Sequence, residues 1–151
     1  MSDSIIKTVE IAAPVPKVWD ALVDHEKFGS WFQVALDQPF VAGQPSTGHM
    51  TYPGYEDYRW EARVVVIEPM TCFAFEWPAT GGDKELMESG VPVPEWTRVE
   101  FRLEPTSGGT RLTVTESGFD KVPEPRRTNV MRDNDGGWTE QVQNIRNYVE
   151  S

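Results

Sequence analysis

The stretch that decides the fold is Asp135-Gly-Gly-Trp-Thr-Glu-Gln-Val-Gln-Asn-Ile-Arg-Asn-Tyr-Val149. Apolar residues recur through it at about 100° per residue, which predicts a long amphipathic helix that begins near Pro125. The apolar stripe consists of Met131, Trp138, Val142, Ile145 and Val149. Gly136 and Gly137 interrupt this pattern, and each glycine costs about 1 kcal/mol relative to alanine inside a helix. We interpret Gly137 as a place where a neighbouring element approaches closely, and Gly136 as a point where the helix bends or breaks.

The chain before this helix has the pattern of one antiparallel sheet. Residues 5–11 alternate as a strand, and two short amphipathic helices follow at 15–23 and 25–32, the second weakened by Gly29. Six further strands are expected at 34–41, 47–52, 58–67, 72–77, 97–103 and 110–115. A sheet with one apolar face and a helix with an apolar stripe must cover each other. The order therefore predicts a single α+β domain over residues 1–151.

One connection is long for a compact domain. Residues 78–96, PATGGDKELMESGVPVPEW, exceed the length of about 12 to 15 residues beyond which loops are usually functional or flexible. Two interpretations remain open. The segment is either a surface excursion with one helical turn at 84–88, or a lid over a binding site.

The charge balance limits the partners of this protein. The chain has 24 acidic and 14 basic residues, a formal net charge of -10, so it repels phosphate backbones and anionic lipids. We expect no nucleic acid partner. Neither a basic leader nor an apolar run of about 20 residues is present, so we expect a cytoplasmic protein with no membrane insertion.

The sequence contains few residues typical of metal or cofactor sites. His25, His49 and Cys72 are the only residues of their kinds, and their spacing is not that of metal ligands. The run from Asp133 to Gly136 resembles the start of a calcium loop, but the later ligand positions hold the wrong residues. Nucleophile elbows, phosphate loops and dinucleotide fingerprints are absent. We therefore expect no metal and no cofactor, and we assign no catalytic residue.

Several charged residues lie on the predicted strands. Arg59, Glu61 and Arg63 follow one another at a spacing of two, which is typical of a charge ladder that faces solvent. A buried carboxylate with a raised pKa could act as a general acid. The sequence leaves open which of Glu61, Glu76 and Glu100 is buried.

The chain resembles a known family over most of its length. The segments that carry the resemblance are 13–22 (APVPKVWDAL), Trp31-Phe32, 64–69 (VVVIEP), 73–77 (FAFEW), 109–114 (GTRLTV) and Gly137-Trp138. In order and spacing they resemble the helix-grip, START-like superfamily, in particular the family named after the C-terminal domain of the activator of the ninety-kilodalton heat-shock chaperone's ATPase. The resemblance implies a curved antiparallel sheet of about seven strands that grips the long C-terminal helix. Two short helices then close one end of a deep cavity.

A cavity of this kind needs a lining, and aromatic residues are the main candidates. The candidates for the lining are Trp31, Phe32, Phe40, His49, Trp60, Phe73, Phe75, Trp77, Phe101, Met131, Asn134, Asp135, Trp138 and Val142. For each aromatic residue, ordinary core packing is the alternative. Asn134 and Asp135 flank the apolar stripe and are expected to supply polar groups that orient a ligand.

The resemblance favours binding of a small hydrophobic or aromatic molecule. A chaperone-linked or stress-related protein-interaction module is the alternative, although the eukaryotic activators carry a separate chaperone-binding domain for which this chain has no room. An enzyme that acts on the cavity ligand ranks third, because no catalytic constellation is visible. We expect a monomer, or a homodimer formed across exposed strand edges.

Overall fold

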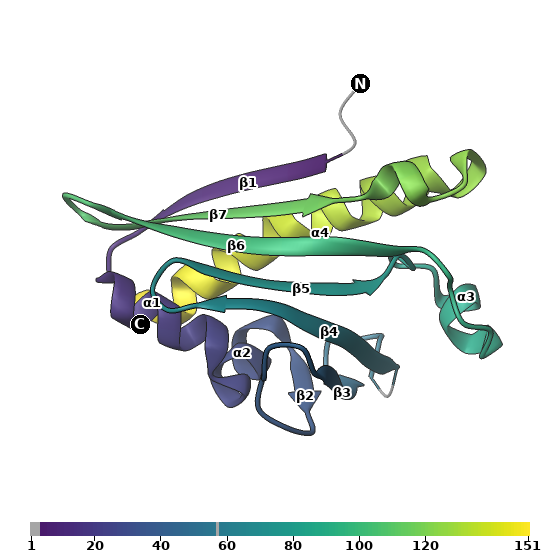
Figure 1. Ribbon diagram of the computed structural model, residues 1–151, viewed down its shortest axis with the longest axis horizontal. Helices are drawn as coiled ribbons and strands as arrows, with labels where there is room; N and C mark the ends of the chain where they lie inside the picture. Colours follow the sequence, from purple (N-terminus) through teal and green to yellow (C-terminus); the bar gives the residue numbers. More distant parts are fainter. Residues whose placement is uncertain (1–3, 57) are drawn as a thin grey trace.

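The computed structural model describes residues 4–56 and 58–151 of the chain (Figure 1). The described elements are β1 (Ser4–Ile11), α1 (Val15–Val23), α2 (His25–Phe32), β2 (Val34–Leu36), β3 (Pro45–Met50), β4 (Arg59–Glu68), β5 (Cys72–Pro78), α3 (Lys84–Ser89), β6 (Trp96–Thr106), β7 (Gly109–Ser117), the short 3-10 helix η1 (Phe119–Lys121) and α4 (Glu124–Glu150). The predicted α+β order is confirmed, and α2 has the bounds that the sequence predicted.

The strands form one antiparallel sheet in the order β1-β7-β6-β5-β4-β3-β2. The first strand joins the last, so β1 and β2 are the two edges of the sheet. Figure 1 shows α4 running across one face of the sheet, with α1 and α2 toward one end of the molecule and α3 at the other. This arrangement confirms the helix-grip fold, because Trp138, Val142, Ile145 and Val149 of the predicted apolar stripe are buried against the sheet. Met131 is half-buried, and its neighbour Val130 is buried in its place.

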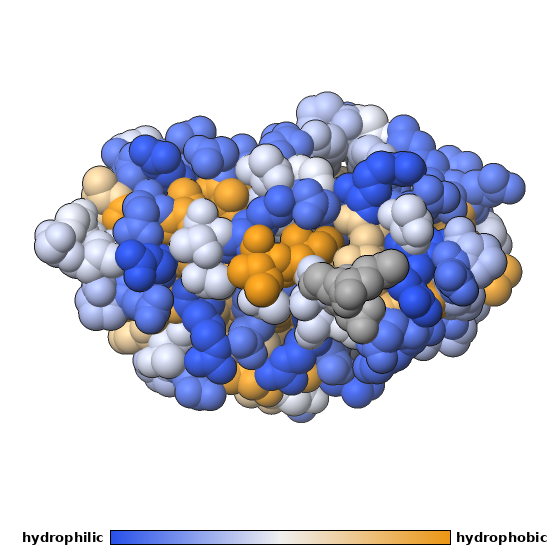
Figure 2. Space-filling view, turned by 90° about the horizontal axis from the view of Figure 1, so that it is seen from above, coloured by the Kyte–Doolittle hydropathy of each residue, from blue (hydrophilic) through white to orange (hydrophobic). Residues whose placement is uncertain are grey.

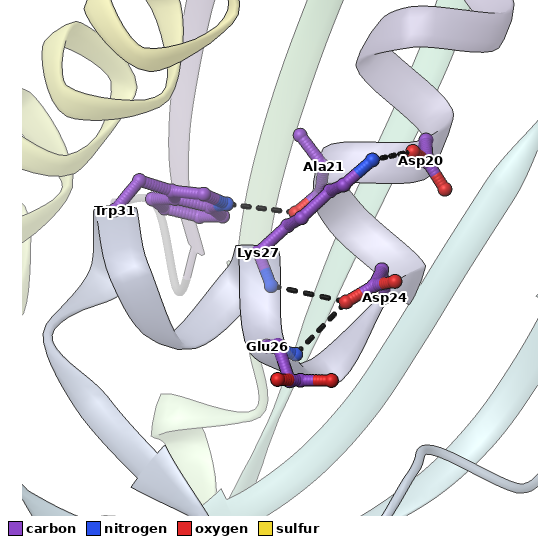
Figure 3. A network of polar contacts seen from close by, with 6 residues as sticks. All are labelled: Asp20, Ala21, Asp24, Glu26, Lys27 and Trp31. Atoms are coloured by element: carbon purple, nitrogen blue, oxygen red, sulfur yellow. Dashed lines mark hydrogen bonds and ion pairs between the residues drawn. The ribbon is translucent and has the colours of Figure 1, made fainter.

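The corner between α1 and α2 is held by side chains that contact the backbone (Figure 3). Asp24 caps α2, because its carboxylate accepts from two backbone N–H groups of the first turn at 3.0 and 3.1 Å. The indole of Trp31 donates to the carbonyl oxygen of Ala21 at 2.8 Å, and Lys27 forms an ion pair with Asp20. These contacts fix the helix that closes this end of the sheet.

Gly29 is required in α2 rather than merely tolerated. The helix ends at Gln33, whose φ of 70° lies in the left-handed region, and the chain turns directly into β2 at Val34. A Cβ atom at position 29 would overlap the carbonyl oxygen of Val34. The residue that weakens the sequence pattern is therefore the one that permits the sharp turn.

The two glycines of α4 contradict two of our predictions, a break of the helix at Gly136 and a close approach at Gly137. The helix is continuous from Glu124 to Glu150, so it does not break at Gly136. A Cβ atom at Gly136 or Gly137 would meet nothing within 4 Å, so no element approaches either residue closely. The close-approach interpretation is wrong, because both residues face open space instead of the sheet.

These contrasting surroundings predict opposite effects of the same substitution. We expect Gly136→Ala to raise the free energy of unfolding by about 1 kcal/mol, because alanine has a higher helix propensity than glycine and its methyl group has space at this position. We expect Gly29→Ala to lower it by about 1–3 kcal/mol, because the new methyl group overlaps backbone. Urea unfolding of the two variants checks both signs. Equal effects in the two helices would contradict this account.

The strand expected at 34–41 is shorter in the structure. β2 ends at Leu36, and the chain then leaves the sheet through Pro39, which has no N–H group for a strand ladder. Phe40 turns inward and its ring lies 4.9 Å from that of Phe73. The apolar pattern that predicted a longer strand therefore belongs to a loop that covers the core.

The face of the molecule on the side of β1 is largely polar. Viewed from the side of β1, the surface is mostly hydrophilic with small separate hydrophobic patches (Figure 2). Within the described part of the chain, every helix is too short or too polar to cross a membrane.

Candidate functional site

A cavity of about 860 Å³ opens between α4, the sheet and residues 79–95. Its volume lies within the range of about 300–1,000 Å³ that is typical of small-molecule sites. Leu86, Met87 and Val91 line it from the long connection, and Gly137 lines it from α4. The open space beside Gly137 is therefore part of the cavity.

The inner wall of the cavity consists of aromatic rings. Trp77 and Trp138 are stacked, with centroids 5.8 Å apart and planes at 30°. Phe32 lies 6.1 Å from the ring of Trp138, and Trp60 lies 5.7 Å from that of Trp77. Offset and tilted contacts at these distances are favourable for aromatic pairs. The four rings form one continuous apolar surface contributed by the sheet and two helices.

Behind this wall lies a buried carboxylate, Glu116, whose exposed fraction is 0 %. Its Oε1 accepts from Trp138 Nε1 at 2.8 Å, and its Oε2 accepts from Trp77 Nε1 at 2.9 Å and from Thr97 Oγ1 at 2.6 Å. Asn134 Nδ2 donates to both oxygens at 3.1 and 3.0 Å. One side chain of β7 therefore orients two of the four cavity rings.

Burial raises the pKa of the Glu116 carboxyl above its ordinary value, because desolvation disfavours the charged form. The hydrogen bonds from Thr97, Trp77, Trp138 and Asn134 act in the opposite direction and are smaller in sum. Glu116 is not part of the cavity lining, because the indoles and the amide stand between it and the cavity. Its geometry is that of a positioning residue.

The same contacts decide what the rings offer to a ligand. The N–H groups of Trp77 and Trp138 are bound by Glu116, and Trp60 Nε1 donates to the buried Ser46 Oγ at 3.0 Å. Each of these indoles thus has its single donor satisfied inside the protein. What remains for a ligand is the faces and edges of the rings.

Our sequence interpretation left the buried carboxylate among Glu61, Glu76 and Glu100, and none of these is buried. Glu61 is exposed, and Glu76 and Glu100 are half-buried. The signal for Glu116 was nevertheless present. Leu112, Val114 and Glu116 follow one another at a spacing of two and so share the inner face of β7.

The structure brings together part of the predicted lining. Of the candidates, those that line the cavity are Phe32, Trp60, Trp77, Asn134 and Trp138. The others that are buried pack in the core around Phe28 or along α4, and these are Trp31, Phe40, Phe73, Phe75, Phe101 and Val142, with Met131 half-buried beside them. Their rings contact one another instead of open space, so they are core residues.

Two predicted polar candidates lie elsewhere. His49 is exposed on β3 and does not line the cavity, whereas Met50 beside it does. Asp135 is exposed and its Oδ1 lies 3.0 Å from Lys7 Nζ, on the side of α4 that faces β1. The residues that we did not predict include Tyr52, Tyr55, Gly137, Glu140 and Gln141.

The long connection is anchored where it leaves and where it rejoins the sheet. Arg126 donates from Nη1 to the carbonyl oxygen of Ala79 at 3.1 Å and from Nη2 to Glu95 Oε1 at 2.7 Å. Gly82 N donates to Asp133 Oδ2 at 3.1 Å. The segment with α3 is thus fastened to α4 as one wall of the cavity.

The fold and the sequence both match known proteins. One similar solved structure is a protein from Arthrobacter aurescens, with a TM-score of 0.77, 20 % sequence identity, and coverage of 97 % of this chain and 86 % of the other. Another is the protein MLL2253 from Mesorhizobium loti, with a TM-score of 0.74, 19 % identity, and coverage of 97 % and 96 %. A third is the Aha1 dimer from Colwellia psychrerythraea, with a TM-score of 0.70, 17 % identity, and coverage of 99 % and 97 %. At these identities the likeness shows a shared fold. No functionally curated protein matches the chain significantly. The family model of activator of Hsp90 ATPase homolog 1-like proteins matches residues 12–150, so the chain belongs to that family.

Proposed function

We propose that the protein binds a small hydrophobic or aromatic molecule in the cavity between the sheet, α4 and residues 79–95. The observation that carries this proposal is the wall of four aromatic rings, Phe32, Trp60, Trp77 and Trp138, beside a cavity of about 860 Å³. A wall whose donors are already satisfied interacts poorly with water and well with apolar surface.

The expected gain in binding comes from two sources. Each Å² of apolar surface that a ligand removes from water contributes about 25 cal/mol. An aromatic ligand that packs against Trp77 or Trp138 gains about 0.5–1.5 kcal/mol more for each favourable ring contact. The network around Glu116 holds both indoles in place before a ligand arrives, so little ordering is needed on binding.

Gly137 provides a direct test, because the cavity occupies the space where its side chain would be. We expect Gly137→Leu to weaken binding of the neutral dye N-phenyl-1-naphthylamine at least tenfold, since the leucine side chain occupies the part of the cavity beside Trp138. Gly136→Leu is the matched control. It places the same side chain one residue away, where it does not line the cavity. Fluorescence titration gives the two dissociation constants.

Equal affinity of the Gly136→Leu and Gly137→Leu variants for the dye would show that the dye does not bind in this cavity. Native mass spectrometry of the purified protein is the complementary measurement. A co-purified molecule that is present in wild type and lost in Gly137→Leu would identify the physiological ligand. A library of hydrophobic metabolites that leaves the melting temperature unchanged for every member would count against the proposal.

A further inference from the structure

The face of α4 that lines the cavity carries two carboxylates separated by a gap. Asp133, Gly137 and Glu140 follow one another at spacings of four and three residues, so they lie on one side of the helix. The two acidic residues are about 10 Å apart along the helix axis. Gly137 has no side chain, so the space between them is open to a ligand.

The polar groups around this gap are acceptors. Glu140 already receives the Tyr52 hydroxyl at 3.1 and 3.2 Å, and Asp133 receives Gly82 N through one oxygen only. Asn134 uses Nδ2 on Glu116, which orients its Oδ1 away from that carboxylate. The side-chain hydrogen bonds of Asn134 in the described part of the chain are made by Nδ2, and every buried side-chain polar atom there has a partner. Asn134 Oδ1 is therefore not buried, and Asn134 is one of the residues that line the cavity.

The charged residues around the cavity also favour a positively charged ligand. Among the described residues, no lysine, arginine or histidine forms an ion pair with Asp133 or Glu140. Arg59 and Glu61 also contribute to the lining, but they are neighbours on one face of β4 and their charges oppose each other. The remaining lining charges are negative, in a chain whose formal net charge is -10.

The aromatic wall favours cations as well. An indole or phenol face attracts a positive group within about 6 Å of the ring centroid. One such contact already exists beside the wall, where Nζ of Lys84, which is not a lining residue, lies 4.7 Å from the ring centroid of the lining residue Tyr55. The indoles of Trp77 and Trp138 also donate their N–H groups to the carboxylate of Glu116, which leaves them no donor for an anion.

We infer that the cavity selects a cationic aromatic ligand, whose rings lie against Trp77 and Trp138 and whose amine lies between Asp133 and Glu140 beside Asn134 Oδ1. This inference rests on the proposed function, because it names the chemical class of the molecule that the cavity binds. Carboxylates, an amide oxygen and ring faces together match an ammonium group. A carboxylate or sulfonate in the same place would face three acceptors, the carboxylates of Asp133 and Glu140 and Asn134 Oδ1.

Three probes that share one ring system and differ in charge test this selection. They are the cation 2-(1-naphthyl)ethylammonium, the neutral 1-ethylnaphthalene and the anion 1-naphthylacetate. In calorimetric titration at 20 mM salt, we expect the cation to bind at least tenfold more tightly than the neutral probe, and the anion most weakly. At 500 mM salt the difference between cation and anion should shrink, because exposed charges are screened.

Two isosteric variants test whether Asp133 and Glu140 cause the preference for the cation. Asp133→Asn and Glu140→Gln keep the oxygen acceptors for Gly82 and Tyr52 but remove a negative charge, so each should reduce the cation preference at least threefold. Glu104→Gln changes the net charge equally. It lies near the end of β6 that is remote from α3, and it should leave the preference unchanged (Figure 1).

Failure of this inference differs from failure of the proposed function. Equal affinities for the three probes, or tighter binding of the anion, would overturn the cation preference while leaving the cavity as a binding site. The preference would also be wrong if Glu104→Gln reduced it as much as Asp133→Asn and Glu140→Gln. If none of the three probes binds and N-phenyl-1-naphthylamine also fails, the proposed function itself is wrong.

Discussion

Replacing Glu116 by leucine is expected to lower the free energy of unfolding by more than about 3 kcal/mol. Leucine cannot accept the N–H groups of Trp77 and Trp138, the Thr97 hydroxyl or the Asn134 amide, which all donate to Glu116. Each buried donor left without an acceptor costs about 1–3 kcal/mol. For a chain of this length the loss corresponds to a fall of roughly 10 °C in the melting temperature. Urea and thermal unfolding measure both quantities.

Glu100→Leu is the matched control, because Glu100 lies on β6 but outside the core. It pairs with Arg98 and Arg102, which are side chains at least two-fifths exposed, and such pairs contribute about 0–1 kcal/mol. A double-mutant cycle sharpens the test. Trp138→Phe should cost less in the Glu116→Leu background than in wild type, because the acceptor for the indole N–H is already gone. If Glu116→Leu costs no more than Glu100→Leu, the account of the network is wrong.

The pH dependence of stability is a second check on the same residue. Burial raises the pKa of Glu116 in the folded state above its ordinary value of 4.5. Between the unfolded and folded pKa values the folded protein binds more protons, so the free energy of unfolding falls as pH rises through this window. The excess stability of wild type over Glu116→Leu should therefore be largest below pH 4.5 and smaller at neutral pH. A difference that grows with pH would contradict the assigned shift.

The fold was largely readable from the sequence because its elements have regular periods. The apolar stripe of α4 and the alternation in β6 and β7 determined both the type and the order of the elements. The errors occur where one residue overrides a period. Pro39 ends the pattern that predicted a longer β2, and Gly137 faces a cavity where we expected a close contact.

The candidate site was harder to predict, because periodicity assigns a residue to an inner face but does not say whether that face is filled. Phe75 and Trp77 alternate on β5 and point to the same side. The ring of Phe75 is enclosed in the core, whereas Trp77 borders the cavity. That difference depends on where residues 79–95 pass and on the missing side chain at Gly137, and neither follows from a local pattern. Glu116 continues the alternation of Leu112 and Val114, but the strand that we expected ended at residue 115, one residue short of it. An acidic residue at an inward position is also unusual.

Phe28→Ala is the second substitution with a large expected effect, and it separates core rings from cavity rings. Phe28 is 0 % exposed and lies 4.8 Å from Trp31, 5.0 Å from Phe32 and 5.3 Å from Phe40 between ring centroids. Removing this ring leaves a void among well-packed neighbours, so we expect a loss of about 3–5 kcal/mol in the free energy of unfolding. Urea unfolding measures this loss, and Phe28→Leu should recover much of it, because leucine refills most of the volume.

A comparison with Phe32 separates the role of a ring in core packing from its role in lining the cavity. Phe32 stacks on Phe28 and also lines the cavity, so Phe32→Ala should weaken binding of N-phenyl-1-naphthylamine as well as lower stability. Phe28 does not line the cavity, so Phe28→Leu should bind the dye within about twofold of wild type at a temperature where both are folded. Equal losses of dye affinity in Phe28→Leu and Phe32→Ala would mean that the core and the cavity are one pliable cluster. A loss of affinity confined to Phe32→Ala would mean that the core stays rigid when Phe28 is changed. Only the ring that lines the cavity would then contribute to binding.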